Sequence, residues 1–178
     1  MDNFRKGNIA ESIEYFDEVL EMSPKQKPFL WQRGLSLYYA NRFVEGAEQF
    51  RSDVAVNPND TEEAIWAFMC EARLDGPEQA QQGMLKVGQD FRPVMRAAYE
   101  AFSGEGTVQQ LEAAAGRDRG GHDRFYSYLY IGLWYEAHND EEAAREYIQA
   151  AAQTPYGQKS GDYMASLAEV HLKQRNWV

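Results

Sequence analysis

The feature that most constrains this sequence is an internal repeat. Pro24 and Pro58 lie 34 residues apart, and Phe16 and Phe50 keep the same offset. Each proline closes a stretch in which apolar residues recur every three or four positions, as on one face of an α-helix. Proline ends such a helix because it lacks the amide N–H and disfavours helical geometry in the residue before it. The repeat therefore predicts helices rather than strands.

Thirty-four residues is the period of the tetratricopeptide repeat, a helix–turn–helix unit. Two stretches have its character, 28–58 and 124–155. Each contains a glycine, Gly34 or Gly132, which we interpret as the small residue that lets the two helices approach closely. We therefore predict an all-α fold in which tetratricopeptide hairpins stack as a short superhelical solenoid.

The middle of the chain departs from the period. Gly34 and Gly132 lie 98 residues apart, which is not a multiple of 34. Thr61 is a candidate helix cap at the start of this middle part. Local apolar patterns still predict helices over 62–74, 77–89, 91–102 and 107–115.

The length of 178 residues is that of one domain or one short repeat array. We predict a single domain over residues 1–178. Its predicted parts are a partial repeat (1–24), a repeat (28–58), irregular helices (61–115), a flexible loop (116–123), a repeat (124–155) and a capping helix (161–176).

The charge and composition of the sequence argue against some classes of binding partner. Acidic residues outnumber basic ones, 28 to 18, for a formal net charge of −10. This excess argues against nucleic acid and against a strongly anionic membrane surface, since both attract clustered Lys and Arg. No run approaches the roughly 18–20 apolar residues that span a bilayer, so we expect no transmembrane segment. The polar start, Met1–Gly7, is also unlike a signal peptide.

The sequence has none of the motifs that would indicate catalysis. It contains no Gly-x-Ser-x-Gly, no His-Glu-x-x-His, and no glycine-rich loop for phosphates or dinucleotides. Cys70, the single cysteine, is interpreted as a core residue in the middle of a helix. His122 and Asp123 follow Asp118 at a spacing that matches no metal motif. We therefore expect no catalytic residue, no bound cofactor and no metal.

Aromatic residues, which make up 13% of the chain, indicate a candidate binding surface. Four candidates are spaced by four, three and four positions along the first helix of the complete repeat: Trp31, Leu35, Tyr38 and Arg42. Tyr39, the fifth candidate, lies about 100° to the side of this stripe. We predict that the stripe borders a groove for a protein segment, with Arg42 at its rim available to a carboxylate of the partner. The alternative is that the aromatics pack between helices.

A second surface feature is an acidic face on the helix before Pro24. Its residues are Glu11, Glu14, Asp17, Glu18 and Glu21. Such a run is either a solvated helix exterior or a surface for a basic partner.

Several stretches of the sequence resemble a known family. They are Phe16–Pro24 (FDEVLEMSP), Arg33–Tyr39 (RGLSLYY), Asn57–Asp60 (NPND) and Phe125–Tyr135 (FYSYLYIGLWY). In order and in spacing they resemble the later repeats of the bacterial lipoprotein family NlpI. The resemblance implies a homodimeric, membrane-tethered adaptor that presents protein substrates to a C-terminal-processing protease and scaffolds cell-wall hydrolases. The family's lipidated cysteine and additional N-terminal helices, which contribute to its dimer, have no counterpart in this sequence.

Two functional hypotheses follow. The first is a non-catalytic protein-binding adaptor or scaffold that presents protein substrates to a protease, as NlpI-like proteins do. The alternative is a structural subunit of a larger multiprotein assembly. The compartment is periplasmic or organelle-lumenal if the resemblance holds and a targeting segment has been removed, and cytoplasmic otherwise.

Overall fold

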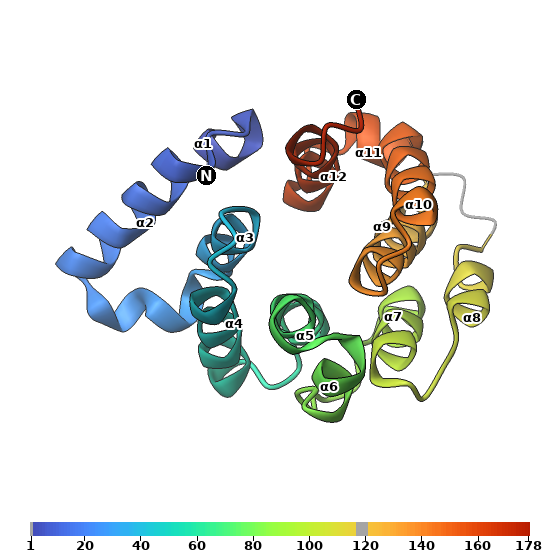
Figure 1. The fold of residues 1–178 in the computed structure, drawn as a ribbon, viewed down its shortest axis with the longest axis horizontal. Coiled ribbons are helices and arrows are strands. Elements are labelled where there is room, and N and C mark those ends of the chain that lie inside the picture. The colour runs from blue at the N-terminus through green and yellow to red at the C-terminus, as the bar shows by residue number, and fades with distance from the viewer. Residues whose placement is uncertain (1, 117–120) are drawn as a thin grey trace. The chain divides into compact units, whose positions relative to one another are not determined.

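The computed structural model describes residues 2–116 and 121–178 (Figure 1). Within these residues all regular structure is helical and no strand is present, which confirms the predicted all-α class. The chain divides into two compact units, residues 1–89 and 90–178, and each is described by itself. In the same described ranges, no helix is both long enough and apolar enough to span a membrane.

The first unit is built from short helices joined by tight turns. Its elements are α1 (Asp2–Lys6), α2 (Ile9–Met22), the 3-10 helix η1 (Pro24–Phe29), α3 (Trp31–Tyr39), α4 (Phe43–Val56), α5 (Thr61–Asp75) and α6 (Pro77–Gln82). α3 and α4 form a helical hairpin, and α5 packs against both of them. The periodicity did not predict η1, which begins at Pro24 and contains a second proline, Pro28.

The start of α5 differs by one residue from the prediction. Its N-cap is Asp60, whose side chain accepts hydrogen bonds from the N–H groups of Glu62 and Glu63 at 3.1 and 3.3 Å. Thr61, the predicted cap, is instead the first residue inside the helix and is buried. Both residue types are suitable caps, and Asp60 takes the role.

The helix predicted over 77–89 was wrong beyond Gln82, where α6 ends. Gly83 caps its end, and residues 84–90 have no helical structure. The Gly88 N–H donates a hydrogen bond to the Pro58 carbonyl at 2.8 Å. The segment after α6 is therefore tied back to the turn between α4 and α5.

The second unit contains a long helical hairpin with shorter helices around it. Its elements are α7 (Pro93–Ser103), α8 (Val108–Ala113), α9 (His122–Ala137), α10 (Glu141–Gln153), α11 (Pro155–Lys159) and α12 (Tyr163–Gln174). Of the predicted loop 116–123, residues 117–120 lie outside the described residues, and the last two belong to α9. The predicted capping helix corresponds to α12, and α11 was not predicted.

The hairpins α3–α4 and α9–α10 have the same close contact between their helices. A Cβ atom added to Gly34 would lie 2.5 Å from Cζ of Phe50, and one added to Gly132 would lie 2.7 Å from Cδ1 of Ile148. In both hairpins the glycine and the side chain above it are 16 residues apart. These contacts confirm that both glycines lie where two helices approach closely.

The turns after α3 and α9 are also alike. Asn41 and Asn139 both adopt left-handed backbone geometry, with φ of 59° and 61°. The N–H of Arg42 then donates to the Leu37 carbonyl at 2.9 Å, and the equivalent bond in the second hairpin closes at 3.0 Å. Asparagine tolerates this geometry better than most residues, so both helices end at the same position.

Substituting leucine for either glycine should destabilise the chain. We expect Gly34→Leu and Gly132→Leu each to lower the free energy of unfolding by about 1–3 kcal/mol, because the added side chain overpacks the helix crossing. Urea denaturation followed by circular dichroism measures this. Gly83→Leu is the matched control, since Gly83 is exposed and a Cβ there would have no atom closer than 3.7 Å. Equal stability of all three variants and the wild type would contradict the assigned contacts.

Candidate functional site

The structure buries three of the five predicted site residues. Leu35 and Tyr38 are fully buried, and Tyr39 is 5% exposed. The Tyr38 ring meets the rings of Phe43 and Trp66 edge-on, with centroids 5.6 and 5.3 Å away. The burial of Leu35 and Tyr38 favours the alternative, in which these side chains pack between helices. α5 packs against α3, and its Trp66 occupies the place that the prediction gave to a partner.

The other two predicted residues, Trp31 and Arg42, are half-buried. Arg42 Nε donates a hydrogen bond to Oε1 of Glu45 at 2.7 Å, one turn along α4. This bond holds the pKa of the Glu45 carboxyl below its usual value and raises the pKa of Arg42. A partner carboxylate that binds Arg42 therefore has to compete with Glu45.

One groove of the first unit lies between α2 and the end of α3 and has a volume of about 430 Å³. This α2–α3 groove is lined by Ile9, Ala10, Ile13, Glu14, Asp17, Tyr39, Ala40 and Arg42. Its lining includes two predicted site residues, Tyr39 and Arg42, and two residues of the predicted acidic face, Glu14 and Asp17. The Asp17 side chain is held in place by α3, because Arg33 Nε donates a hydrogen bond to its Oδ1 at 2.8 Å. The groove thus has an apolar floor and a charged rim.

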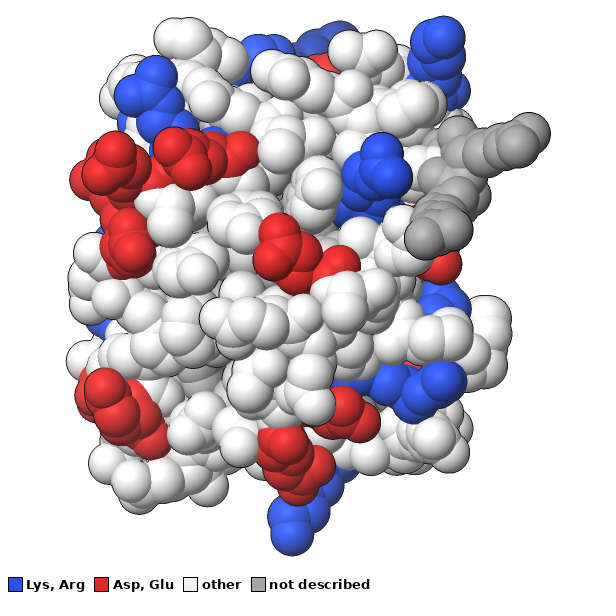
Figure 2. Space-filling view, turned by 90° about the vertical axis from the view of Figure 1, so that its right-hand side faces the viewer, with Lys and Arg blue, Asp and Glu red and all other residues white. Residues whose placement is uncertain are grey.

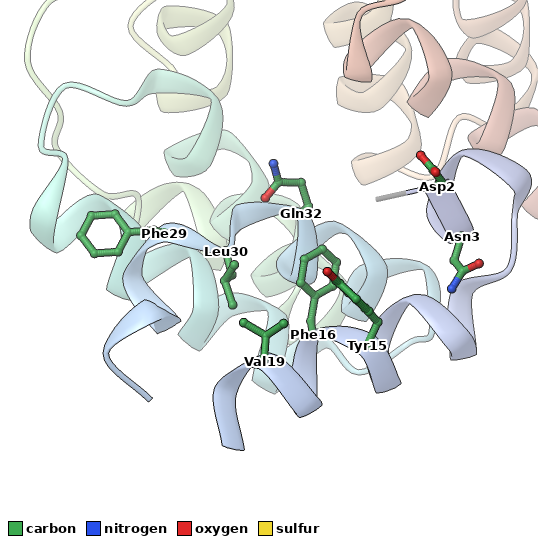
Figure 3. A pocket seen from close by; sticks show the side chains of 8 residues that line it. All are labelled: Asp2, Asn3, Tyr15, Phe16, Val19, Phe29, Leu30 and Gln32. Atoms are coloured by element: carbon green, nitrogen blue, oxygen red, sulfur yellow. The ribbon is translucent and has the colours of Figure 1, made fainter. Parts of the chain in front are cut away.

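A second groove of the first unit, between α2 and η1, has a volume of about 630 Å³ (Figure 3). This α2–η1 groove is lined by Asp2, Asn3, Tyr15, Phe16, Val19, Phe29, Leu30 and Gln32. Tyr15 and Phe29 are 54% and 63% exposed beside it. Sequence reasoning missed this groove, although apolar residues at 15, 19 and 22 on the outer side of α2 were a signal for it.

Buried hydrogen bonds hold η1 against α4. Gln49 Nε2 donates to the carbonyl of Lys27 at 2.6 Å and to Oδ1 of Asp53 at 3.0 Å. Gln49 is itself fully buried, and Arg33 Nη1 donates to its Oε1 at 3.4 Å. Because Lys27 lies two residues before Phe29, this network fixes the η1 wall of the α2–η1 groove.

Two buried carboxyl groups lie where α4 and α5 meet. Burial raises the pKa of Asp53 to about 7 and that of Glu63 to about 9. Asp53 Oδ2 and Glu63 Oε2 have no hydrogen-bond partner among the described residues. At neutral pH Glu63 is therefore protonated, and it acts as a neutral core residue.

The second unit contains a buried histidine, His171 of α12. Its Nε2 lies 3.6 Å from Oε1 of Glu136, which also accepts a hydrogen bond from Arg175 Nε at 2.5 Å. Burial lowers the pKa of His171 to about 4, so the imidazole is neutral at pH 7. The Trp177 ring lies against it with centroids 5.3 Å apart. This cluster joins the end of the chain to α9.

Charged side chains on the face drawn in Figure 2 are scattered. Among the described residues drawn there, Lys and Arg lie in separate places between acidic side chains and uncharged surface. A nucleic-acid interface needs basic residues gathered over one surface. This face does not have that arrangement.

The remaining candidates for chemistry are the single cysteine and the side chains that could bind a metal ion. Cys70 is fully buried, and burial raises the pKa of its thiol, which keeps it protonated. No group of three His, Cys, Asp or Glu side chains in 2–116 and 121–178 could hold a metal ion. Of the three residues considered from sequence, Asp118 lies outside the described residues, and His122 Nδ1 lies 2.8 Å from Oδ1 of Asp123.

No protein-family model matches the chain.

Proposed function

We propose that this chain is a non-catalytic protein-binding adaptor or scaffold, built from tetratricopeptide-like helical hairpins. The observation that carries the proposal is the α2–α3 groove, in which an apolar floor that includes Ile13 and Tyr39 is bordered by Glu14 and Arg42. An apolar centre with a charged rim is the usual arrangement of a protein-binding surface. The buried, protonated Cys70 supports a role without thiol catalysis.

The finer form of the proposal is that the chain presents protein substrates to a C-terminal-processing protease. The support for it is the resemblance of the sequence to NlpI-like proteins. The repeated contacts Gly34–Phe50 and Gly132–Ile148 support the tetratricopeptide-like arrangement of the hairpins.

The second candidate is a structural subunit of a larger multiprotein assembly. Phe91, which is 89% exposed, and Met22, which is 79% exposed, favour it. Large apolar side chains at such exposure are common where a permanent partner covers them.

Charge reversal at Arg42 tests the adaptor proposal. We expect Arg42→Glu to lower the amount of partner captured from native extract about tenfold, because it places a carboxylate beside Glu45 at the rim of the groove. Capture is measured by pull-down and mass spectrometry, with circular dichroism to check folding. Arg145→Glu is the matched control, since Arg145 is exposed on α10 and the charge change is the same.

Each result of this experiment favours one candidate function. Loss of capture in Arg42→Glu alone supports an adaptor that uses the α2–α3 groove. Equal recovery of one stoichiometric assembly by wild type and both variants would contradict it and favour the structural subunit. A protease among the proteins lost with Arg42→Glu would support the finer proposal.

A further inference from the structure

The 3-10 helix η1 is a weakly anchored segment of the first unit. None of its six residues is buried, and two are prolines, which lack the N–H that a backbone hydrogen bond needs. Its backbone is bound to α4 through the Lys27 carbonyl, which accepts a hydrogen bond from Gln49 Nε2 at 2.6 Å. Segments with few buried contacts open locally at a lower free energy than the core around them. The bond between Gln49 and Lys27 is therefore central to holding η1 in place.

The same glutamine is bound to an ionisable group. Gln49 Nε2 also donates to Oδ1 of Asp53 at 3.0 Å, and both side chains are almost completely buried. The second carboxyl oxygen of Asp53, Oδ2, has no hydrogen-bond partner among the described residues. One side-chain amide thus connects the attachment of η1 to a buried carboxyl group that is only partly satisfied.

The groups around Asp53 do not compensate a negative charge on it. The half-buried Lys27 of η1 favours the ionised form, but the carboxylate of Asp60, at the start of α5, opposes it. Glu63 of α5 also faces this site and is protonated at neutral pH. Arg33 of α3 donates to the glutamine at 3.4 Å and not to the carboxyl group. Burial therefore dominates, and it raises the pKa of Asp53 to about 7.

Opening of η1 changes the surroundings of this carboxyl group. The Lys27 carbonyl and Asp53 Oδ1 bind the same amide nitrogen, so release of η1 admits water to Asp53 and returns its pKa toward the ordinary value of 3.8. Between these two pKa values the open state has lost a proton that the closed state keeps. Opening therefore becomes more favourable as the pH rises, and the increase ends above about pH 7.

We propose that Gln49 and Asp53 form a pH-sensitive latch, which holds η1 against α4 most firmly in acidic solution and weakens as the pH rises to neutrality. Phe29 and Leu30, at the end of η1, line the α2–η1 groove. The latch therefore sets how firmly one wall of this groove is fixed. This conformational response belongs to the fold and does not depend on the adaptor function.

Hydrogen exchange of the Gln49 side-chain amide measures the opening, because this buried amide exchanges only when it leaves its partners. The rate in the full chain is followed by NMR and divided by the rate of a free side-chain amide at the same pH. We expect this ratio to rise about tenfold or more between pH 5 and pH 7 and then to level off. The ratio for the backbone N–H of the buried Phe50 should stay below it throughout, since that group exchanges only when more of the unit unfolds.

Two variants identify the group that titrates. Asp53→Asn should abolish the rise at Gln49, because asparagine still accepts the hydrogen bond but has no proton to lose. Glu63→Gln is the matched control, since it removes the other buried carboxyl group of this region and should leave the rise unchanged. A rise that persists in Asp53→Asn or disappears in Glu63→Gln would overturn the proposal. Equal ratios for Gln49 and Phe50 would do so as well, because the exchange would then report unfolding of the whole unit.

A measurement on the wild type covers the case in which Asp53→Asn does not fold. The carboxyl carbon of Asp53 is followed by NMR as a function of pH. Its titration midpoint should coincide with the pH at which the Gln49 ratio levels off. A midpoint at the ordinary value of an aspartate, or a Gln49 ratio that does not change with pH, would show that there is no latch.

Discussion

Tyr38→Ala is expected to lower the free energy of unfolding by about 3–5 kcal/mol, the usual effect of removing a large buried aromatic side chain. The ring of Tyr38 is fully buried, and its centroid lies 5.3 Å from those of both Trp66 and Tyr39. Its removal leaves a cavity between α3 and α5 that these rigid rings cannot fill. Urea denaturation followed by far-ultraviolet circular dichroism measures the loss.

Tyr15→Ala provides the control for this substitution. It removes the same atoms from a side chain that is 54% exposed, so the stability should change by less than about 0.5 kcal/mol. If the Tyr38→Ala variant unfolds at the urea concentration of the wild type, the ring is not part of the core. Position 38 would then return as a candidate for the binding surface.

Glu63→Gln is expected to make the chain more stable in alkaline solution and its stability less dependent on pH. Burial, with the nearby carboxylates of Asp60 and Asp53 adding to it, raises the pKa of Glu63 in the folded chain from 4.5 to about 9. On unfolding, the pKa returns to its ordinary value. Between these two values the folded state keeps a proton that the unfolded state has lost, so stability falls as pH rises. The fall is at most about tenfold in the folding equilibrium constant per pH unit.

The glutamine variant has no proton to lose at position 63. Its unfolding free energy should exceed that of the wild type at pH 8 and approach it near pH 5, when both are measured by urea denaturation. A smaller fall remains from Asp53, whose pKa of about 7 acts in the same direction. The exposed Glu48→Gln control should follow the wild-type curve. Parallel curves for Glu63→Gln and the wild type would show that Glu63 ionises normally in the folded chain.

The helical hairpins could be predicted because their cause is local and periodic. Gly34 and Gly132 are recognisable as close-contact residues, since only a residue without a side chain fits beneath Phe50 or Ile148. Helix ends were less predictable. α6 stops at Gln82, and the segment beyond it is tied by the Gly88 N–H to the Pro58 carbonyl, a partner 30 residues away in the sequence.

The candidate site could be predicted only in part. Helical spacing shows that Trp31, Leu35, Tyr38 and Arg42 share one side of a helix, but not which neighbour covers that side. α5 covers its middle, where Tyr38 meets Trp66, and leaves Trp31 and Arg42 half-buried at the two ends. Phe29 was missed for another reason. It ends a 3-10 helix that contains two prolines, and a period of 3.6 residues does not describe such a segment.

The bond from Gln49 to the Lys27 carbonyl has a consequence for the thermodynamics of recognition. It holds η1 in place before any partner arrives, and α2 is held likewise by its packing on α3. The two walls of the groove therefore lose their conformational entropy during folding. Binding then orders only the incoming segment. The entropic cost of binding at the α2–η1 groove would then depend on the incoming segment alone.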